Sequence, residues 1–323
     1  MSVRPTGRNR SAALPAAPGE AAHGLLRSRR TRHLERVIEA GLFGAAVLGV
    51  ATTVGIVLVL VVETVEFFGR VSPLEFATGT VWSALIEPRS FGVLPLVAGT
   101  LLVTGIALAL AVPLGLLAAL FLAEYAPPGV RAIVKPVLET LAGIPTIVLG
   151  FFALSFVTPA LLKPLLGDAI GTFNALSAGI VVGLLVSPLI ASISEDAMRA
   201  VPRSLREAGH AIGATRLEVA REIVVPAALS GIVASVVLAT SRAIGETMAV
   251  YLAAGTNPRL TLDPRESVQT MTAFIVQVSL GDTPQGSTEY LSLFAVAALL
   301  FGATLGLNLL SARLVRRYRT VVA

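Results

Sequence analysis

Cysteine is absent from this sequence, and charged residues are scarce. Without cysteine the chain has no disulfide, thiolate metal site or cysteine nucleophile. Only 14% of its 323 residues are charged, whereas 54% are hydrophobic. That balance is far more apolar than the surface of a water-soluble domain requires, so lipid is expected to be the main solvent of this protein.

The groups that bind nucleotides or metals are also scarce. The only two lysines, Lys135 and Lys163, are each followed by proline, whereas a P-loop needs lysine followed by serine or threonine after a glycine-rich turn. The three histidines, His23, His33 and His210, match no zinc spacing. The chain is therefore predicted to have no catalytic site, ATPase site, metal or cofactor of its own.

Long apolar runs dominate what is present. A helix needs roughly 20 apolar residues to cross a bilayer core, and five runs without charge reach that length. They are 40–62, 90–123, 140–162, 169–194 and 290–312. A sixth run, 223–258, is interrupted by Arg242 and Glu246. Backbone groups in lipid must bond internally, and the alternation of a membrane barrel is missing. We predict an all-α integral membrane protein with about six transmembrane helices.

Helix breakers and short apolar segments interrupt this pattern. Pro113, Pro145, Pro159 and Pro188 lie inside predicted spans, where neighbouring groups must satisfy the backbone atoms that proline leaves unbonded. The stretch 271–280 is too short to cross, and we expect it to lie on the outer surface or to dip partway in.

Basic residues predict the orientation in the membrane. Most arginines lie before the first span, in the loops near 131 and 195–226, or after the last span. By the positive-inside rule both termini are cytoplasmic, in a multi-pass protein of the cell membrane. Orientation explains this charge better than a nucleic-acid partner does.

The sequence divides into a tail, a first helix and a core. Residues 1–35 are rich in Arg, Ala, Pro and Gly and are predicted to be disordered. Arg29 and Arg30 resemble a twin-arginine signal, but the apolar run that follows is too long for a signal peptide. We therefore predict an uncleaved helix over 36–68, a core over 90–315 and a cytoplasmic tail over 316–323.

The loop 195–226 carries a spaced motif. It reads Glu207-Ala208-Gly209, three residues, Gly213, nine residues, Ile223, one residue and Val225-Pro226. This spacing resembles the EAA motif of ABC importer permeases, with Gly209 in place of alanine and Val225 in place of leucine. The resemblance implies two short helices meeting near Gly213 that dock on a separate ATPase. Small residues near Gly209 are expected to allow close approach of that partner, and the alternative is an ordinary amphipathic loop.

A second motif lies in the interrupted run. The segment 241–250 reads SRAIGETMAV, 141–146 reads LAGIPT and 270–273 reads TMTA. Together they resemble the PstC-type permeases of phosphate ABC importers, over roughly residues 90–315. The companion PstA-type permeases share the arginine and the GET pattern, and the TMAV continuation favours the PstC type.

This resemblance implies a fold and a set of partners. It implies the MetI-like permease fold and a heterodimer with a PstA-like permease. It also implies two copies of a PstB-like ATPase, which bind ATP and magnesium, and an extracytoplasmic phosphate-binding protein. The chain is then expected to carry inorganic phosphate inward, driven by ATP hydrolysis on the partner.

Two charged residues in the interrupted run need a physical explanation, because a charge deep in a membrane costs about 2.5 to 3.5 kcal/mol on insertion scales. If one helix runs on from Pro226, Glu246 lies one turn beyond Arg242 on the same face. They then form either a structural ion pair or, with Thr247, part of the substrate path. In the path Arg242 is the countercharge of an anion, while Glu246 holds Arg242 or accepts a hydrogen bond from protonated phosphate.

Three other functions stay open at this stage. The transported ion could be another oxyanion, such as sulfate or molybdate. A secondary transporter driven by an ion gradient would need no coupling loop, so Glu207, Gly213 and Pro226 argue against it. A membrane scaffold that senses phosphate without transporting it is the third, and a signalling role is compatible with transport.

Overall fold

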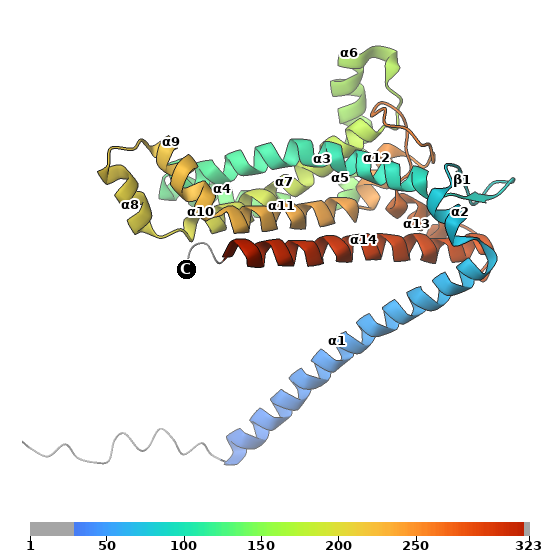
Figure 1. Ribbon diagram of the computed structural model, residues 1–323, viewed down its shortest axis with the longest axis horizontal. Coiled ribbons are helices and arrows are strands. Elements are labelled where there is room, and N and C mark those ends of the chain that lie inside the picture. Colours follow the sequence, from blue (N-terminus) through green and yellow to red (C-terminus); the bar gives the residue numbers. More distant parts are fainter. Residues whose placement is uncertain (1–28, 320–323) are drawn as a thin grey trace, which may run out of the picture. The chain divides into compact units, whose positions relative to one another are not determined.

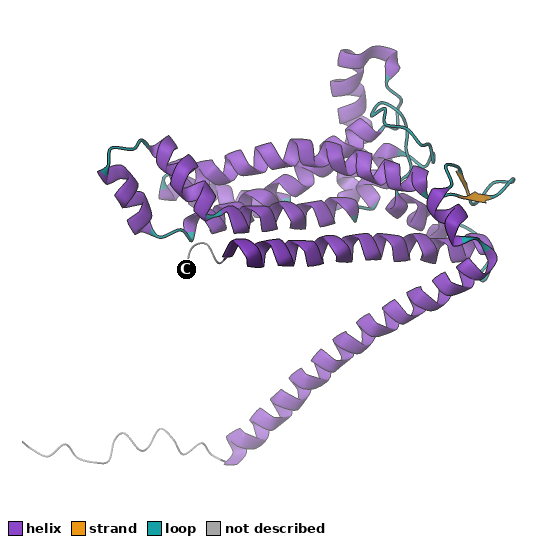
Figure 2. Cartoon of the chain, viewed as in Figure 1, coloured by secondary structure: helices purple, strands orange, loops and turns teal. Residues whose placement is uncertain are grey.

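Helices make up nearly all of the computed structural model, which describes residues 29–319 (Figure 1 and Figure 2). The greater part of the predicted tail 1–35 and the last four residues lie outside the described range. The chain divides into two units between Leu58 and Val59, inside the first helix α1, Arg29–Arg70. Each unit is described by itself.

The first unit consists of the N-terminal part of α1. Its apolar side chains are exposed, as at Val37, Leu42 and Phe43. An apolar helix of this length suits a lipid environment. The predicted first membrane helix, 36–68, lies within the observed bounds of α1.

The second unit begins with the remainder of α1 and contains all other elements. In chain order they are α2 (Pro73–Thr78), β1 (Trp82–Ser83), β2 (Ser90–Phe91), α3 (Leu94–Leu120), η1 (Phe121–Tyr125), α4 (Pro128–Leu141), α5 (Thr146–Phe152), η2 (Ala153–Leu162), α6 (Lys163–Leu166), η3 (Gly167–Ala169), α7 (Ala175–Arg199), α8 (Arg203–Ala211), α9 (Arg216–Val219), η4 (Ala220–Val224), α10 (Val225–Ala227), α11 (Leu229–Ile244), α12 (Met248–Ala254), α13 (Met271–Leu280) and α14 (Thr288–Arg319). The antiparallel strands β1 and β2 form a small hairpin.

The long helices agree with the predicted spans. Among the described residues five helices are long and apolar enough to cross a membrane, and a sixth span results if one bent pair is counted as a single span. That pair joins 216–227 to 229–244 at an angle of 71°. In Figure 1 α8 and α9 lie at one end of the bundle and the β1–β2 hairpin at the other. We call these the loop end and the hairpin end.

Helices α3 and α7 approach each other closely because glycine lies at the contact. A methyl group at Gly183 of α7 would lie 2.8 Å from the carbonyl oxygen of Ala107 on α3. One at Gly179 would lie 2.5 Å from Cγ2 of Ile106, and Gly115 of α3 faces Ile190 in the same way. Small residues permit this approach where the hydrophobic effect does not drive helix association. The α3–α7 contact forms the centre of the bundle.

The fifth predicted span is not one helix. Helix α11 ends at Ile244, Gly245–Thr247 is not helical, and α12 begins at Met248. The expectation that Arg242 and Glu246 share a face one turn apart is therefore wrong. Glycine is unfavourable inside a helix by about 1 kcal/mol, and local bonds close the α11 terminus, with Gly245 N–H donating to Ser241 O at 3.2 Å.

The short apolar helix α13 enters the bundle instead of lying on its surface. Its Phe274 is 1% exposed, and Met271 and Val278 are also buried. Thr270 caps the helix by accepting a hydrogen bond from Ala273 N–H at 3.2 Å. Met271 N–H donates to Thr100 Oγ1 of α3 at 3.0 Å. Capping and this cross-helix bond satisfy N–H groups that a buried helix start leaves unbonded.

The α3–α7 contact generates a prediction about stability. Replacing Gly183 by valine should lower the free energy of unfolding by about 1 to 3 kcal/mol, as overpacking commonly does. Gly105→Val is the matched control, because nothing lies within 4 Å of a Cβ placed at Gly105 in α3. Thermal unfolding of the detergent-solubilised protein measures both variants. Equal melting temperatures for the two would contradict the role given to this contact.

Candidate functional site

Arg242 lies in the last turn of α11 and is exposed. Over residues 35–313, whose side chains the structure describes, its side chain forms no ion pair or hydrogen bond. Its neighbour Ser241 donates to Asn308 Oδ1 of α14 at 3.0 Å, so polar contacts hold the end of α11 against α14. Among these residues the guanidinium is thus a positive charge without a partner at the end of an apolar helix.

Glu246 has a different environment from Arg242. Its side chain is buried at 8% exposure, and its Oε1 accepts a hydrogen bond from Ala249 N–H of α12 at 3.4 Å. Its carbonyl accepts a hydrogen bond from Thr272 Oγ1 at 2.8 Å. Thr247 is half-buried, and its hydroxyl donates to Gly245 O at 3.0 Å. Glu246 therefore holds the break together and does not pair with Arg242.

The helix that follows the break in the fifth span packs against a helix that follows a second break. The LAGIP motif begins at the last residue of α4, and its residues 142–145 separate α4 from α5. On α5 a methyl group at Gly150 would lie 3.0 Å from Ala249 Cα of α12. The two motifs are about a hundred residues apart in the sequence, and the fold places the helices that follow them against each other.

The 195–226 loop folds as the motif predicts, with two short helices, α8 and α9, joined by a turn. Gly213 in this turn has a φ of +88°, a conformation that side chains with a Cβ rarely adopt. Thr215 and Glu218 form a capping box at the start of α9. Ile212, beside the turn, is 87% exposed.

The motif residues of the loop separate into an inner and an outer set. A methyl group at Gly209 would lie 2.6 Å from Ile223 Cδ1 and 3.0 Å from Val219 Cγ2, so the small size of Gly209 allows α8 to pack on the segment after it. This differs from the expectation that Gly209 makes room for the partner. Glu207, Ala208 and Pro226 are exposed and remain available to a partner.

Arg206 anchors the loop to the membrane helices, and the sequence analysis did not single it out. Its Nη2 donates to Met198 O at 2.7 Å and its Nη1 donates to Val201 O at 2.6 Å. Its Nη2 also lies 3.1 Å from Glu124 Oε1 in η1. One guanidinium thus joins α8 to the C-terminal end of α7 and to the end of α3 and η1.

A buried carboxylate forms a second anchor that sequence reasoning missed. Glu195 of α7 is 0% exposed, and its oxygens lie 2.7 Å from Arg131 Nε and 2.8 Å from Lys135 Nζ of α4. Lys135 also pairs with Asp196. Burial lowers the pKa of Lys135, but its hydrogen bonds to Asp196 and Glu195 outweigh burial and hold it above its ordinary value. The ion cluster fixes α4 to the loop end of α7.

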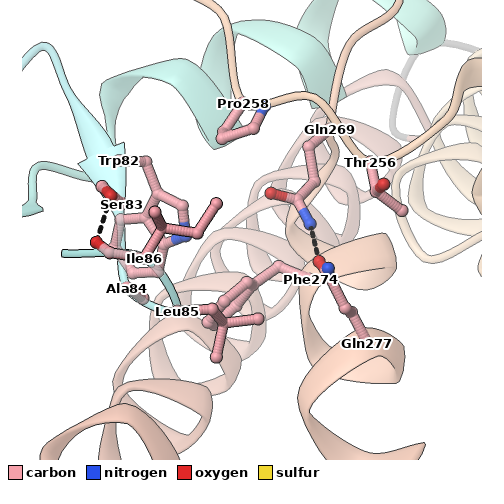
Figure 3. Close-up of a pocket in the computed structure, with 10 residues that line it drawn as sticks. All are labelled: Trp82, Ser83, Ala84, Leu85, Ile86, Thr256, Pro258, Gln269, Phe274 and Gln277. Atoms are coloured by element: carbon pink, nitrogen blue, oxygen red, sulfur yellow. Dashed lines mark hydrogen bonds between the residues drawn. The ribbon is translucent and has the colours of Figure 1, made fainter. Parts of the chain in front are cut away.

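A small cavity with a mostly apolar lining lies at the hairpin end (Figure 3). It has a volume of about 90 Å³ and is enclosed by three parts of the chain: the β1–β2 hairpin, helix α13, and the segment that follows α12. Gln269, which is 2% exposed, donates to Gln277 Oε1 at 2.5 Å. This amide pair ties the segment before α13 to α13 itself, and no sequence motif indicated it.

The chain matches a known family over most of its core. The sequence profile of the family described as "Binding-protein-dependent transport system inner membrane component" matches residues 111–320. The chain is 36% identical over 280 residues to the probable ABC transporter permease protein YqgH of Bacillus subtilis, covering 85% of this chain and 89% of the relative. It is 31% identical over 266 residues to the phosphate transport system permease protein PstC of Haemophilus influenzae, covering 77% and 82%.

Solved structures with low sequence identity share the fold. A bacterial ABC transporter involved in the import of the acidic polysaccharide alginate superposes with a TM-score of 0.62 at 16% identity, over 90% of this chain and 99% of the other. The MetNI methionine ABC transporter in an inward-facing conformation superposes with a TM-score of 0.52 at 19% identity, over 70% and 94%. These likenesses concern the fold alone.

These findings define the class of the protein. The chain belongs to the inner-membrane components of binding-protein-dependent transport systems. It is a permease subunit of an ABC importer, a multi-pass membrane protein that lacks an ATPase domain of its own.

The Arg206 anchor generates a prediction about the loop. Arg206→Gln removes the hydrogen bonds to Met198 O, Val201 O and Glu124, so we expect severalfold faster amide exchange in α8. A loss of roughly 1 to 3 kcal/mol in stability should accompany it, as for a lost charged hydrogen bond. Arg221→Gln, an exposed site in the same loop, is the control. Hydrogen exchange read by mass spectrometry measures both, and unchanged exchange in Arg206→Gln would contradict the anchor.

Proposed function

We propose that this chain forms one half of the translocation path of an ATP-driven importer for inorganic phosphate. The observation that carries this proposal is Arg242, a charged guanidinium next to a break in an apolar span, with no partner among the side chains that the structure describes. The identity of the ion is supported by the SRAIGETMAV motif and by relatives whose names are phosphate transport system permease proteins.

The physical basis is the cost of an isolated charge. A cation in an apolar region is destabilising unless it faces a bundle interior, a water-filled path or an opposite charge. A passing phosphate ion provides that opposite charge, and the planar fork of guanidinium donors matches two of its oxygens. A path that carries such an anion therefore needs a group of this kind.

The alternative of a structural ion pair with Glu246 receives no support from the geometry. The carboxylate of Glu246 is turned to the N–H of Ala249, and its backbone carbonyl accepts from Thr272. Within residues 35–313 nothing pairs with the side chain of Arg242, and in this proposal its partner is the substrate.

Glu246 has a second possible task in the same path. Among the described residues only Oε1 of Glu246 has a hydrogen-bond partner. Its other carboxylate oxygen is left to accept a hydrogen bond from a protonated phosphate oxygen. Phosphate near neutral pH still carries a proton that it can donate, whereas sulfate does not. In this proposal Glu246 favours phosphate over sulfate, and Thr247, whose hydroxyl lies at the same break, is the third residue of the path.

The partners follow from the architecture of an ABC importer. We assign a PstA-like permease as the second half of the path, in a heterodimer with this chain. Two copies of a PstB-like ATPase provide ATP hydrolysis with magnesium, and an extracytoplasmic phosphate-binding protein delivers the ion. Glu207, Ala208 and Pro226 contact the ATPase directly, whereas Gly209, Gly213 and Ile223 hold the loop in shape. Both termini are then cytoplasmic, on the ATPase side.

The path is tested by removing the charge of Arg242. Arg242→Gln should still insert and assemble, but its phosphate uptake should fall roughly ten- to a hundredfold, as expected when a charge-assisted contact is lost. Arg242→Lys keeps the charge without the fork and should retain part of the uptake. Labelled phosphate uptake into vesicles, with subunit assembly checked in parallel, gives the measurement.

Further arms of this experiment separate the alternatives. Near-normal uptake by assembled Arg242→Gln would refute the pathway role. Excess unlabelled sulfate should leave wild-type phosphate uptake unchanged, and strong competition by sulfate would point to another oxyanion. Glu246→Gln keeps an oxygen for Ala249 N–H, so we expect it to assemble normally and to discriminate less well between the two ions.

The turn at Gly213 generates a separate prediction about coupling. Gly213→Val places a β-branched residue at a φ of +88°, which L-residues reach at a cost of about 1 to 2 kcal/mol or more. We expect less co-purified ATPase and reduced uptake. Gly213→Asn is the control, since asparagine tolerates this conformation. Full ATPase binding and uptake in the valine variant would count against coupling through this turn.

A further inference from the structure

A basic pocket lies at the loop end, away from the break in the fifth span. It has a volume of about 210 Å³ and is lined by Ala123, Glu124, Arg199, Arg203 and Arg206. The lining comes from three elements that meet there, which are η1, the end of α7 and the first turn of α8. Its volume is enough for a small ion together with bound water.

The charges in this pocket do not balance. Glu124 is neutralised by Arg206, whose Nε and Nη2 lie 3.2 Å and 3.1 Å from its Oε1. Arg199 lies 3.6 Å from Glu195, but that carboxylate is shared with the closer cations Arg131 and Lys135. Over the side chains that the structure describes, Arg203 has no acidic partner. The pocket therefore carries an excess of positive charge.

The start of α8 adds to this excess. Pro202 occupies the N-cap position, no side chain caps the helix, and its first turn contains no acidic residue. Helix starts carry free N–H groups and a partial positive charge, so a cation such as Arg203 in the first turn is unfavourable there. An anion in the pocket would compensate both the arginines and the start of the helix.

We infer that this pocket binds a phosphate-type oxyanion, at a site separate from the translocation path. Arg203 and Arg199 provide the guanidinium donors for the anion. Arg206 holds η1 and the end of α7 in place through its hydrogen bonds to Glu124 and Met198 O. The shared chemistry is a tetrahedral phosphate group, whose source is either free inorganic phosphate or the headgroup of an anionic phospholipid. An occupant joins α7 to α8, so it stiffens the base of the loop.

The inference is tested on the assembled transporter in nanodiscs. Amide exchange over residues 199–211 is measured in phosphatidylcholine discs with and without millimolar inorganic phosphate, and in discs containing phosphatidylglycerol without free phosphate. Protection by phosphate alone identifies the free ion, and protection by phosphatidylglycerol alone identifies the headgroup. Either result supports the site, and protection by neither would overturn it.

Matched variants keep this test specific. Arg203→Gln breaks no hydrogen bond in the described structure and should weaken the protecting anion's apparent affinity about tenfold, the effect of one charge-assisted contact. Arg203→Lys should restore part of it, and Arg216→Gln, in the same loop but outside the pocket, should not change it. Arg242→Gln should also keep the protection, which separates this site from the path. Equal protection in Arg203→Gln and wild type would overturn the inference.

Discussion

The contact between α3 and α7 is the feature on which the rest of the structure depends. Glycines at 115, 179 and 183 let the two backbones approach, and each helix then positions other elements. Helix α3 receives the start of α13 through Thr100, and α7 carries Glu195, which binds α4. Lipid provides no hydrophobic force to press helices together, so close packing and internal polar bonds have to hold the bundle.

The break in the fifth span also has to be held by internal polar bonds. An interrupted helix in an apolar bundle is stable only where its free backbone groups find partners. The hydroxyl of Thr272 donates to the carbonyl of Glu246. The carboxylate of Glu246 accepts from the N–H of Ala249 at the start of α12. Arg242, one helical turn before the break, has no such partner among the described residues. These bonds give Glu246 a structural role, whereas the side chain of Arg242 has no such role among the described residues, which is the basis of the pathway role that we propose for it.

The loop at the other end of the bundle has an inward and an outward surface. Gly209 and Ile223 pack on each other, and Arg206 joins α8 to α7 and to η1. Exposed residues such as Glu207 and Ile212 are left for a partner. Arg206 therefore gives α8 direct polar contacts with the segments in which two membrane helices end.

The sequence by itself determined the apolar spans, the helical class and the two motifs, because length, hydropathy and spacing are local properties of the chain. It also placed the turn at Gly213, where a motif glycine coincides with a positive φ. Only the tertiary structure decided that Arg242 and Glu246 do not pair, that α13 is inserted in the bundle, and that Glu195 meets Arg131 and Lys135. Glu195 pairs with residues 64 and 60 positions away in the sequence, and a hydropathy pattern carries no information about such distant partners. In the break after Gly245 the carbonyl of Glu246 accepts a hydrogen bond from Thr272 of α13, a contact that no window along the sequence could reveal.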